Sequence, residues 1–426
     1  MSSQDFVLFA LQITTMLACA LFFGQIMRRL KQPAVVGEMI GGIFLGPTVF
    51  GMVAPALYAW LFQSSANVAI VREASIKLGM LFFLFIAGME VNVSDLRRLG
   101  RKAVSIGLVG TLVPIGIGVG LVYLLPHDYW GPVARSHFLS FGLFIGMNLA
   151  NSANPVIARI LMDLGLLQGE IGTLIMTATV VDDLINWTLF AIILSDIQPS
   201  GQAATTTLPV SIGLVILFFA VVQGIGRWLG PPALRWLRRH VAWPSGFIAV
   251  TTLVILISAS ISEGLGIHAF LGAFLIGVAL AGDEAEKNEA HDVITHFALS
   301  FFAPIYFVSM GMNANFITNF DWMLVSLILV VACVSKVGAV LLGARMAGMP
   351  LNREAWAIGF GLNARGATGI ILAGVGLANR VIDERIYVAV VVMALVTSLM
   401  SGPAMSFFLS HRVPAVGHAQ GEATST

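Results

Sequence analysis

The chain of 426 residues is 58% hydrophobic and only 11% charged, with a mean hydropathy of +0.90. Charged residues make up about a quarter of a typical soluble domain, so this composition excludes an ordinary soluble protein and predicts one that crosses a membrane many times. The formal net charge of +1 gives no basic surface for nucleic acid. Both cysteines, Cys19 and Cys333, fall in apolar segments and indicate neither a disulfide framework nor a metal site.

Apolar runs of spanning length follow one another along nearly the whole chain. A run of about 20 apolar residues is long enough to cross a bilayer as an α-helix. About thirteen such runs predict an all-α polytopic membrane protein, with a single transmembrane domain over residues 1–412 and a short cytoplasmic tail over 413–426. The expected helices lie at about 6–27, 34–52, 69–91, 103–125, 138–162, 167–194, 206–229, 245–262, 265–281, 293–312, 322–346, 354–378 and 386–410.

Lysine and arginine are distributed unevenly between the two sets of loops that these helices create. Fifteen of the 23 fall on one face, whereas the other face holds only Arg72, Arg135, Arg380 and Arg385. Cytoplasmic loops carry the excess of positive charge, so we expect the N-terminus outside and the C-terminus in the cytoplasm. The chain is therefore predicted to be a multi-pass protein of the plasma or inner membrane, embedded in lipid and without a nucleic-acid partner.

Two of the expected helices contain residues that interrupt a helix. The fifth holds Asn148–Pro155, with three asparagines, a serine and a proline, and the twelfth holds Gly359–Gly369, with four glycines, an asparagine and an arginine. Unwound backbone at membrane depth is tolerated only where protein or a cavity satisfies it. If helices 1–6 and 8–13 form two inverted repeats around a linker at 206–229, each broken helix is the fifth of its repeat. Interruptions at matching places indicate the substrate site of a transporter.

Two adjacent carboxylates, Asp182 and Asp183, lie in the middle of the sixth expected helix. The stretch from Ile171 to Leu194 carries no other charge. A charged side chain near the bilayer centre costs roughly 2.5–3.5 kcal/mol on insertion scales, and two adjacent carboxylates also repel each other. An intramembrane acid is by default an ion or proton site, so the pair predicts where an ion binds.

The residues around this pair predict cation chemistry. Na⁺ is a hard ion that prefers oxygen ligands, which Asp183, the carbonyls freed around Asn154, and the hydroxyls of Ser152 or Thr177 could supply. A desolvated carboxylate binds either a proton or a cation, and this competition combined with alternating access produces exchange. We expect no cofactor, and we expect no enzyme activity because no nucleophile–base pair or metal-ligand cluster stands out in the sequence.

Seven motifs follow one another in a fixed order. They are Val36–Pro47, Phe85–Glu90, Asn154–Arg159 with the Asp182-Asp183 pair, Gly264–Gly277, Tyr306–Gly311, Lys336 and Asn363–Ala367. In these motifs the chain resembles the second family of monovalent cation–proton antiporters, which includes NapA-type sodium–proton exchangers, Kef-type potassium systems and plant CHX proteins. The resemblance covers nearly the whole membrane region. It implies an NhaA/NapA-like antiporter fold of two inverted repeats with crossing broken helices, and a homodimer.

The resemblance also implies a division of the chain into moving and fixed parts. A mobile ion-binding core, over about 100–195 and 322–411, would move against a dimerisation scaffold over about 6–91 and 245–312. The helix at about 206–229 would link the two repeats.

Individual site residues follow from the same resemblance. In members with an Asp-Asp pair, the second aspartate binds the cation and the first pairs with a lysine before the second break. Here Asp183 would be the Na⁺ ligand, and Lys336 would be the charge partner of Asp182. Alternatives remain. Lys336 could pair with a backbone carbonyl or another acid, and Asn154 could cap the broken helix. Arg365 could neutralise half-helix carbonyl ends, pair with an acid, or line the ion path.

The sequence therefore predicts a secondary active Na⁺(Li⁺)/H⁺ antiporter that is electrogenic and works by elevator-type alternating access. A K⁺/H⁺ antiporter or a Kef-like K⁺ efflux system is the first alternative. A sodium-coupled symporter for organic anions is the second, although two acids would repel an anion.

Overall fold

A computed structural model of the chain describes residues 2–30, 32, 34–89, 93–131, 134, 136–164, 166, 167, 169–197, 245–265, 269–280 and 288–409, with isolated positions at 213, 217, 221, 222, 224 and 228. Every regular element within these residues is a helix, so the all-α prediction is confirmed. By length and composition, seven helices in this described part of the chain can each cross a membrane.

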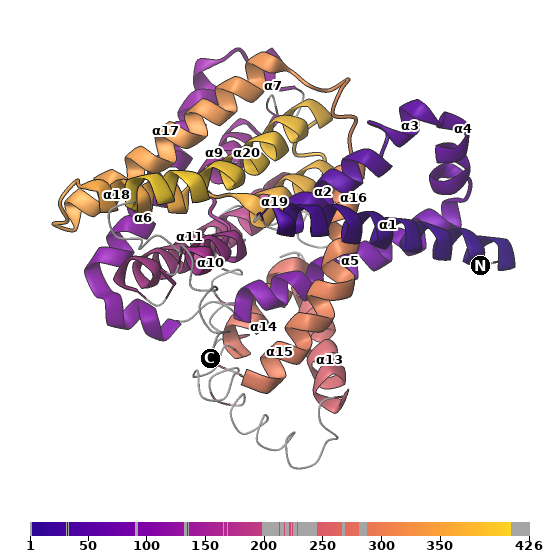
Figure 1. The fold of residues 1–426 in the computed structure, drawn as a ribbon, viewed down its shortest axis with the longest axis horizontal. Helices are drawn as coiled ribbons and strands as arrows, with labels where there is room; N and C mark the ends of the chain where they lie inside the picture. The colour runs from indigo at the N-terminus through magenta and orange to yellow at the C-terminus, as the bar shows by residue number, and fades with distance from the viewer. Residues whose placement is uncertain are drawn as a thin grey trace, which may run out of the picture.

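The helices are numbered along the chain as in Figure 1. Those of the first half are α1 (Ser3–Arg29), α2 (Ala34–Leu45), α3 (Phe50–Val53), α4 (Pro55–Tyr58), the π-helix η1 (Ala59–Gln63), α5 (Ala66–Met89), α6 (Val93–Leu124), α7 (His127–Trp130), α9 (Phe138–Ala150), α10 (Asn154–Asp163) and α11 (Glu170–Ile197). Those of the second half are α13 (Ser245–Gly264), α14 (Ala269–Leu280), α15 (Asn288–Phe297), the π-helix η3 (Ala298–Phe302), α16 (Ala303–Met312), α17 (Trp322–Met346), α18 (Arg353–Leu362), α19 (Gly366–Ala378) and α20 (Glu384–Leu409).

Helices cover the expected apolar segments except one. The linker at about 206–229 lies outside the described residues apart from isolated positions, as does the tail at 413–426. Two features of the sequence prediction need correction. Helix α6 begins at Val93, well before the expected start near 103, and the short helices between residues 50 and 63 were not predicted.

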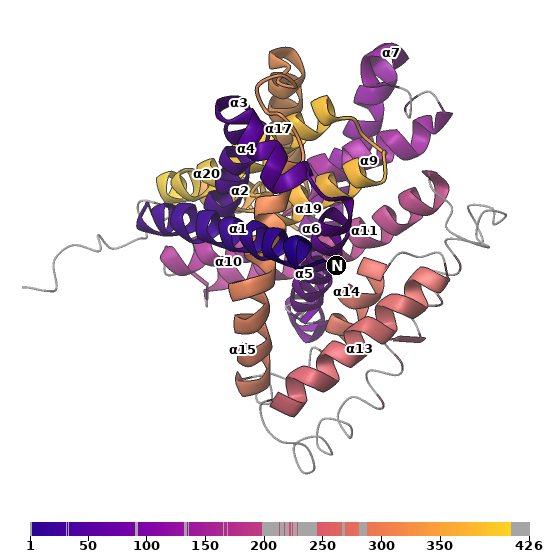
Figure 2. The same ribbon diagram turned by 90° about the vertical axis from the view of Figure 1, so that its right-hand side faces the viewer.

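The helices pack in two groups. The first helix group contains α1, α2, α5, α13, α14 and α16, and the second contains α6, α9–α11 and α17–α20. In Figure 1 the second group fills the upper left of the molecule, and α13–α15 gather at the lower end in both views (Figures 1 and 2). Glycines permit close approach inside each group: a Cβ on Gly118 of α6 would overlap the backbone of Gly146 in α9, and one on Gly42 of α2 would overlap Val308 in α16.

Contacts between the groups include aromatic rings and both the backbone and the side chain of Met310, whose sulfur packs on Gly374 of α19. The rings of Trp187 in α11 and Phe274 in α14 lie 5.7 Å apart, centre to centre. The hydroxyl of Tyr387 in α20 donates to the carbonyl of Met310 in α16 over 2.6 Å. Helix α19 lies beside α2 and α16 at this boundary (Figure 1).

Both interrupted helices are broken where the sequence predicts, over shorter segments. Residues 151–153 separate α9 from α10, and residues 363–365 separate α18 from α19. The two segments meet: the Ala153 amide donates to the Ala364 carbonyl over 2.7 Å, which satisfies backbone groups that the breaks leave free. Gly366 begins α19 with φ of +39°, a conformation that side chains with a Cβ rarely adopt.

Candidate functional site

The aspartate pair lies in the middle of α11, within the second helix group. Asp182 is 1% exposed and Asp183 is 4% exposed, so both carboxylates are removed from solvent. A buried carboxylate needs hydrogen-bond donors or a cation to offset the loss of hydration. The surrounding helices supply such groups.

Three donors from three helices surround Asp182. The ammonium of Lys336 in α17 lies 3.2 Å from Oδ2. The amide nitrogen of Asn186, one turn further along α11, donates to Oδ1 over 3.0 Å, and the hydroxyl oxygen of Thr111 in α6 lies 2.6 Å from the same atom. Both oxygens of Asp182 are therefore used as acceptors, as an ionised carboxylate uses them.

Lys336 has a second acceptor, because its ammonium also donates to the carbonyl of Ala150, the last residue of α9. The structure thus brings together the two alternatives for this lysine, a carboxylate and a backbone carbonyl. A helix carboxyl end carries partial negative charge, so a cation there is stabilised.

Arg365, in the second unwound segment, is fully buried and also faces the end of α9. Its guanidinium donates to the carbonyls of Leu149 over 2.5 Å, Asn148 over 3.3 Å and Ala332 over 2.9 Å, and to both the carbonyl and the side chain of Asn363. The structure places Arg365 on the carbonyl end of α9, one of the positions considered from the sequence. Two cations, Arg365 and Lys336, thus meet the carboxyl end of α9.

Asp183 contacts the other side of the break. The side-chain amide of Asn154, the first residue of α10, donates to Asp183 Oδ2 over 2.5 Å. Asn154 caps no helix end, because Ala153 stands at the cap position and makes no side-chain cap bond. The first unwound segment is thereby tied to the second aspartate.

The remaining sequence candidates, Ser152 and Thr177, have their hydroxyl hydrogens directed at backbone carbonyls. Ser152 donates to Leu362 at the end of α18 over 2.7 Å, so it joins the two breaks. Thr177 donates to Thr173 within α11 over 2.8 Å. Their oxygen lone pairs are the atoms that a cation could use.

Several amide groups near the break are buried with atoms that have no hydrogen-bond partner among the described residues. They are the side-chain oxygens of Asn148, Asn154 and Asn186 and both polar atoms of Asn151. An unsatisfied buried polar atom calls for an ordered water or an ion. Neutral oxygens beside two carboxylates match the ligand preference of a hard monovalent cation. Within the described residues, no cluster of three or more His, Cys, Asp or Glu side chains could hold a metal ion.

Sequence reasoning missed Thr111 and Asn186 as site residues. The signal for Asn186 was its spacing of four residues from Asp182, which puts both side chains on one face of the helix. Thr111 gave a weaker signal, a hydroxyl in a long apolar run. Its contact depends on how α6 packs against α11, which the sequence does not reveal.

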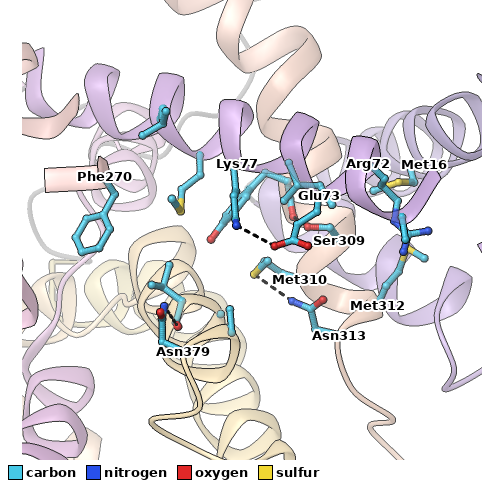
Figure 3. A pocket seen from close by; sticks show the side chains of 18 of the residues that line it. Met16, Arg72, Glu73, Lys77, Phe270, Ser309, Met310, Met312, Asn313 and Asn379 are labelled. Atoms are coloured by element: carbon cyan, nitrogen blue, oxygen red, sulfur yellow. Dashed lines mark hydrogen bonds and ion pairs between the residues drawn. The ribbon is translucent and has the colours of Figure 1, made fainter. Parts of the chain in front are cut away.

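A cavity of about 770 Å³ lies between the two helix groups. The first group lines it from α1, α5, α14 and α16, and the second group lines it with Gly374, Val375, Ala378 and Asn379 at the end of α19. Figure 3 shows Glu73 and Lys77 of α5 on one side and Asn379 on the other. Lys77, which lies within the helix expected at about 69–91, pairs with Glu73 over 2.9 Å, and both side chains are exposed.

A family model described as sodium/hydrogen exchanger, transmembrane, matches residues 14–411. The chain belongs to the sodium/hydrogen exchanger family. This confirms the resemblance that the seven motifs carry, because the matched region contains all of them.

Relatives of this exchanger-family chain are named for different cations. Cation/H(+) antiporter 18 of Arabidopsis thaliana is 34% identical over 400 residues, which cover 92% of this chain and 48% of the plant protein. Na(+)/H(+) antiporter NhaS4 of Synechocystis sp. is 29% identical over 406 residues, covering 95% and 97%. K(+)/H(+) antiporter 1 of Saccharomyces cerevisiae is 28% identical over 411 residues, covering 94% and 46%. The chain thus spans about half the length of the plant and yeast relatives.

The fold also matches a solved exchanger structure. The sodium proton antiporter MjNhaP1 of Methanocaldococcus jannaschii superposes with a TM-score of 0.68 at 14% identity, over 96% of this chain and 99% of that one. At this identity the likeness shows a shared fold.

Proposed function

We propose that this protein is a secondary active Na⁺(Li⁺)/H⁺ antiporter in which Asp183 binds either the cation or a proton. The observation that carries the proposal is a buried aspartate pair beside the meeting point of two unwound segments, with Lys336 3.2 Å from Asp182. The side-chain oxygen of Asn154 lies beside the same break, where it supplements Asp183 as a cation ligand. The Na(+)/H(+) antiporter NhaS4, related over nearly its full length, supports the choice of Na⁺.

Exchange requires that the site open to each side in turn. The second helix group, with about 100–195 and 322–411, moves as the core against a scaffold of about 6–91 and 245–312. Supporting this, helices approach closely inside each group, whereas the boundary holds aromatic and methionine contacts and the 770 Å³ cavity. The cavity is then a vestibule on the side to which the amino end of α5 points, which the distribution of basic loops puts outside.

We further propose that the protein has thirteen membrane spans in two inverted repeats, with the N-terminus outside and the C-terminus in the cytoplasm. The scaffold supplies a homodimer interface. Exposed apolar side chains on α1, including Phe6, Leu21 and Phe22, support a surface that meets lipid or a second copy of the chain.

Electrogenic exchange requires a second proton in each cycle. Lys336 is the group to release it, since a cation entering beside Asp182 and Asp183 replaces the ammonium as their counter-charge. The cation-loaded and proton-loaded forms then differ by one charge, so a membrane potential changes the exchange rate.

A K⁺/H⁺ exchanger is the second candidate, and the yeast relative named a K(+)/H(+) antiporter favours it. The two candidates share the site and differ in the size of the ion that the oxygens fit. Selectivity therefore has to be measured directly.

The test is a panel of Na⁺, Li⁺ and K⁺ in proteoliposomes with an imposed pH gradient, on the wild type and Asp183→Asn. We expect Na⁺ and Li⁺ to dissipate the gradient in the wild type, and Asp183→Asn to abolish exchange because an amide cannot take up a proton. Glu170→Gln, an exposed acid on the same helix, is the matched control and should exchange normally. Normal exchange by Asp183→Asn would refute the site, and a response to K⁺ alone would favour the second candidate.

A further inference from the structure

Asp182 has two neutral donors in addition to its cationic partner. Thr111 comes from α6 and Asn186 from α11, and both contact Oδ1, whereas Lys336 contacts Oδ2. All three residues are buried, with Thr111 fully so. Lys336 contacts only Oδ2, so Thr111 and Asn186 supply the hydrogen bonds to Oδ1, the oxygen that Lys336 does not contact.

The hydroxyl oxygen of Thr111 lies 2.6 Å from Asp182 Oδ1, within the usual range for an O–H···O hydrogen bond. Thr111 has one hydroxyl hydrogen and a second acceptor, the carbonyl of Gly107 at 2.7 Å in its own helix. The single hydrogen can serve only one of these two acceptors at a time. An ionised carboxylate is a stronger acceptor than a backbone carbonyl, so we assign the Thr111 hydrogen to Asp182 when Asp182 is charged.

The amide of Asn186 also depends on Asp182. Its nitrogen donates to Oδ1 over 3.0 Å, and its oxygen has no partner among the described residues. The contact with Asp182 is thus the bond that fixes this amide. A four-residue spacing along α11 holds the two side chains together.

We propose that Thr111 and Asn186 are positioning residues that keep Asp182 an anion during the part of the cycle in which Lys336 has released its proton. The inference rests on the proposed function and deepens it. If Asp182 took up the proton of Lys336, that proton would stay in the site and no second proton would be exchanged. Two neutral donors that remain in place prevent this, and they confine proton exchange to Asp183 and Lys336.

The charges around Asp182 agree with this assignment. In the part of the chain that the structure describes, Lys336 of α17 contacts Asp182, and Arg365 between α18 and α19 interacts with it electrostatically. Asp183 is the neighbour of Asp182 in α11 and acts on Lys336. Among the described residues, α6 and the end of α9 contribute only neutral groups, the Thr111 hydroxyl and backbone carbonyls. When Lys336 is a neutral amine, its contact with Asp182 is no longer an ion pair, whereas Thr111 and Asn186 still donate to Oδ1.

The test compares Thr111→Val, which keeps the shape and removes the hydroxyl, with Thr111→Ser, which keeps the hydroxyl. Exchange is measured in proteoliposomes across pH at saturating Na⁺, together with the reversal potential. We expect Thr111→Val and Asn186→Leu each to raise the pH of half-maximal exchange by about one unit, the size of one lost hydrogen bond to a charged group. The charge moved per Na⁺ should fall in both. Thr111→Ser should restore the wild-type profile.

Thr252→Val is the matched control, because Thr252 donates to its own helix over 2.8 Å in α13 of the other group. It should leave the pH profile unchanged. The inference is overturned if Thr111→Val keeps the wild-type profile, if Thr111→Ser shifts as far as Thr111→Val, or if Thr252→Val shifts equally. If Thr111→Val does not fold, Asn186→Leu and Thr111→Ser still decide the matter. If Asp183→Asn loses exchange but Thr111→Val keeps the wild-type pH profile, this inference is wrong while the proposed function stands.

Discussion

The two unwound segments contact each other and bond to different groups. Residues 151–153 and the following Asn154 are neutral, and Asn154 reaches Asp183. Residues 363–365 include a buried arginine that reaches back to the end of α9. The first segment thus contacts the aspartate that we propose binds the ion, and the second holds the first in place. One side chain at each break sets its role. Asn154 makes the first break part of the proposed ion site, and Arg365 makes the second a structural support.

Arg365→Ala is the substitution with the largest expected effect on this contrast between the two segments. The change leaves several buried carbonyls without a donor, each at a cost of about 1–3 kcal/mol, so we expect the protein to lose most of its stability. Thermal unfolding in detergent measures the loss. Arg365→Lys should recover part of it, since an ammonium keeps the charge without the planar fork. Arg345→Ala, an exposed arginine at the end of α17, is the control, and an equal loss there would remove the contrast.

Asn154→Ala tests the role of the first unwound segment. Loss of the amide on Asp183 should raise the apparent KM for Na⁺ about tenfold, equivalent to roughly 1.4 kcal/mol, while unfolding changes little. Initial rates across Na⁺ concentrations measure the effect. Asn319→Ala is the control. It removes a side-chain hydrogen bond from Asn319 to Glu384, away from the site, and should keep the wild-type KM. A loss of stability without a change in KM would assign Asn154 a structural role.

Ser152→Ala should have the smallest effect. It removes one hydrogen bond between the segments, from Ser152 to the Leu362 carbonyl, which contributes about 1 kcal/mol. The unfolding midpoint should fall slightly and exchange should persist. A KM change as large as that of Asn154→Ala would show that the serine oxygen belongs with the ion ligands, and the first segment would then contact the ion at two points.

Much of this organisation could be predicted from the sequence. Apolar runs located the helices, and clustered asparagine, proline and glycine located both breaks. The cost of burying Asp182, Asp183 and Lys336 made their proximity a reasonable expectation, since isolated charges in an apolar interior need partners. The family followed from motif order along the chain.

The rest depended on three-dimensional register. Helix α6 is apolar over most of its length, so no periodic pattern identifies the face that packs on α11 or singles out Thr111. The partners of Arg365 are backbone carbonyls, which carry no sequence signal at all. Thr177 could be proposed from its position near the aspartates, but the sequence could not show that its hydrogen is bound to Thr173.

The crossing also has a consequence for biosynthesis. Ser152 and Ala153 donate to the second break, and Arg365 donates to the carboxyl end of α9 in the first. While the ribosome is still making the second half, the first half sits in the membrane with α9 carbonyls that lack these donors, at a cost of several kcal/mol for a group facing lipid. Packing of the second half against the first therefore completes the hydrogen bonds of both breaks. We expect the first break to reach its final structure only after the second half has been inserted.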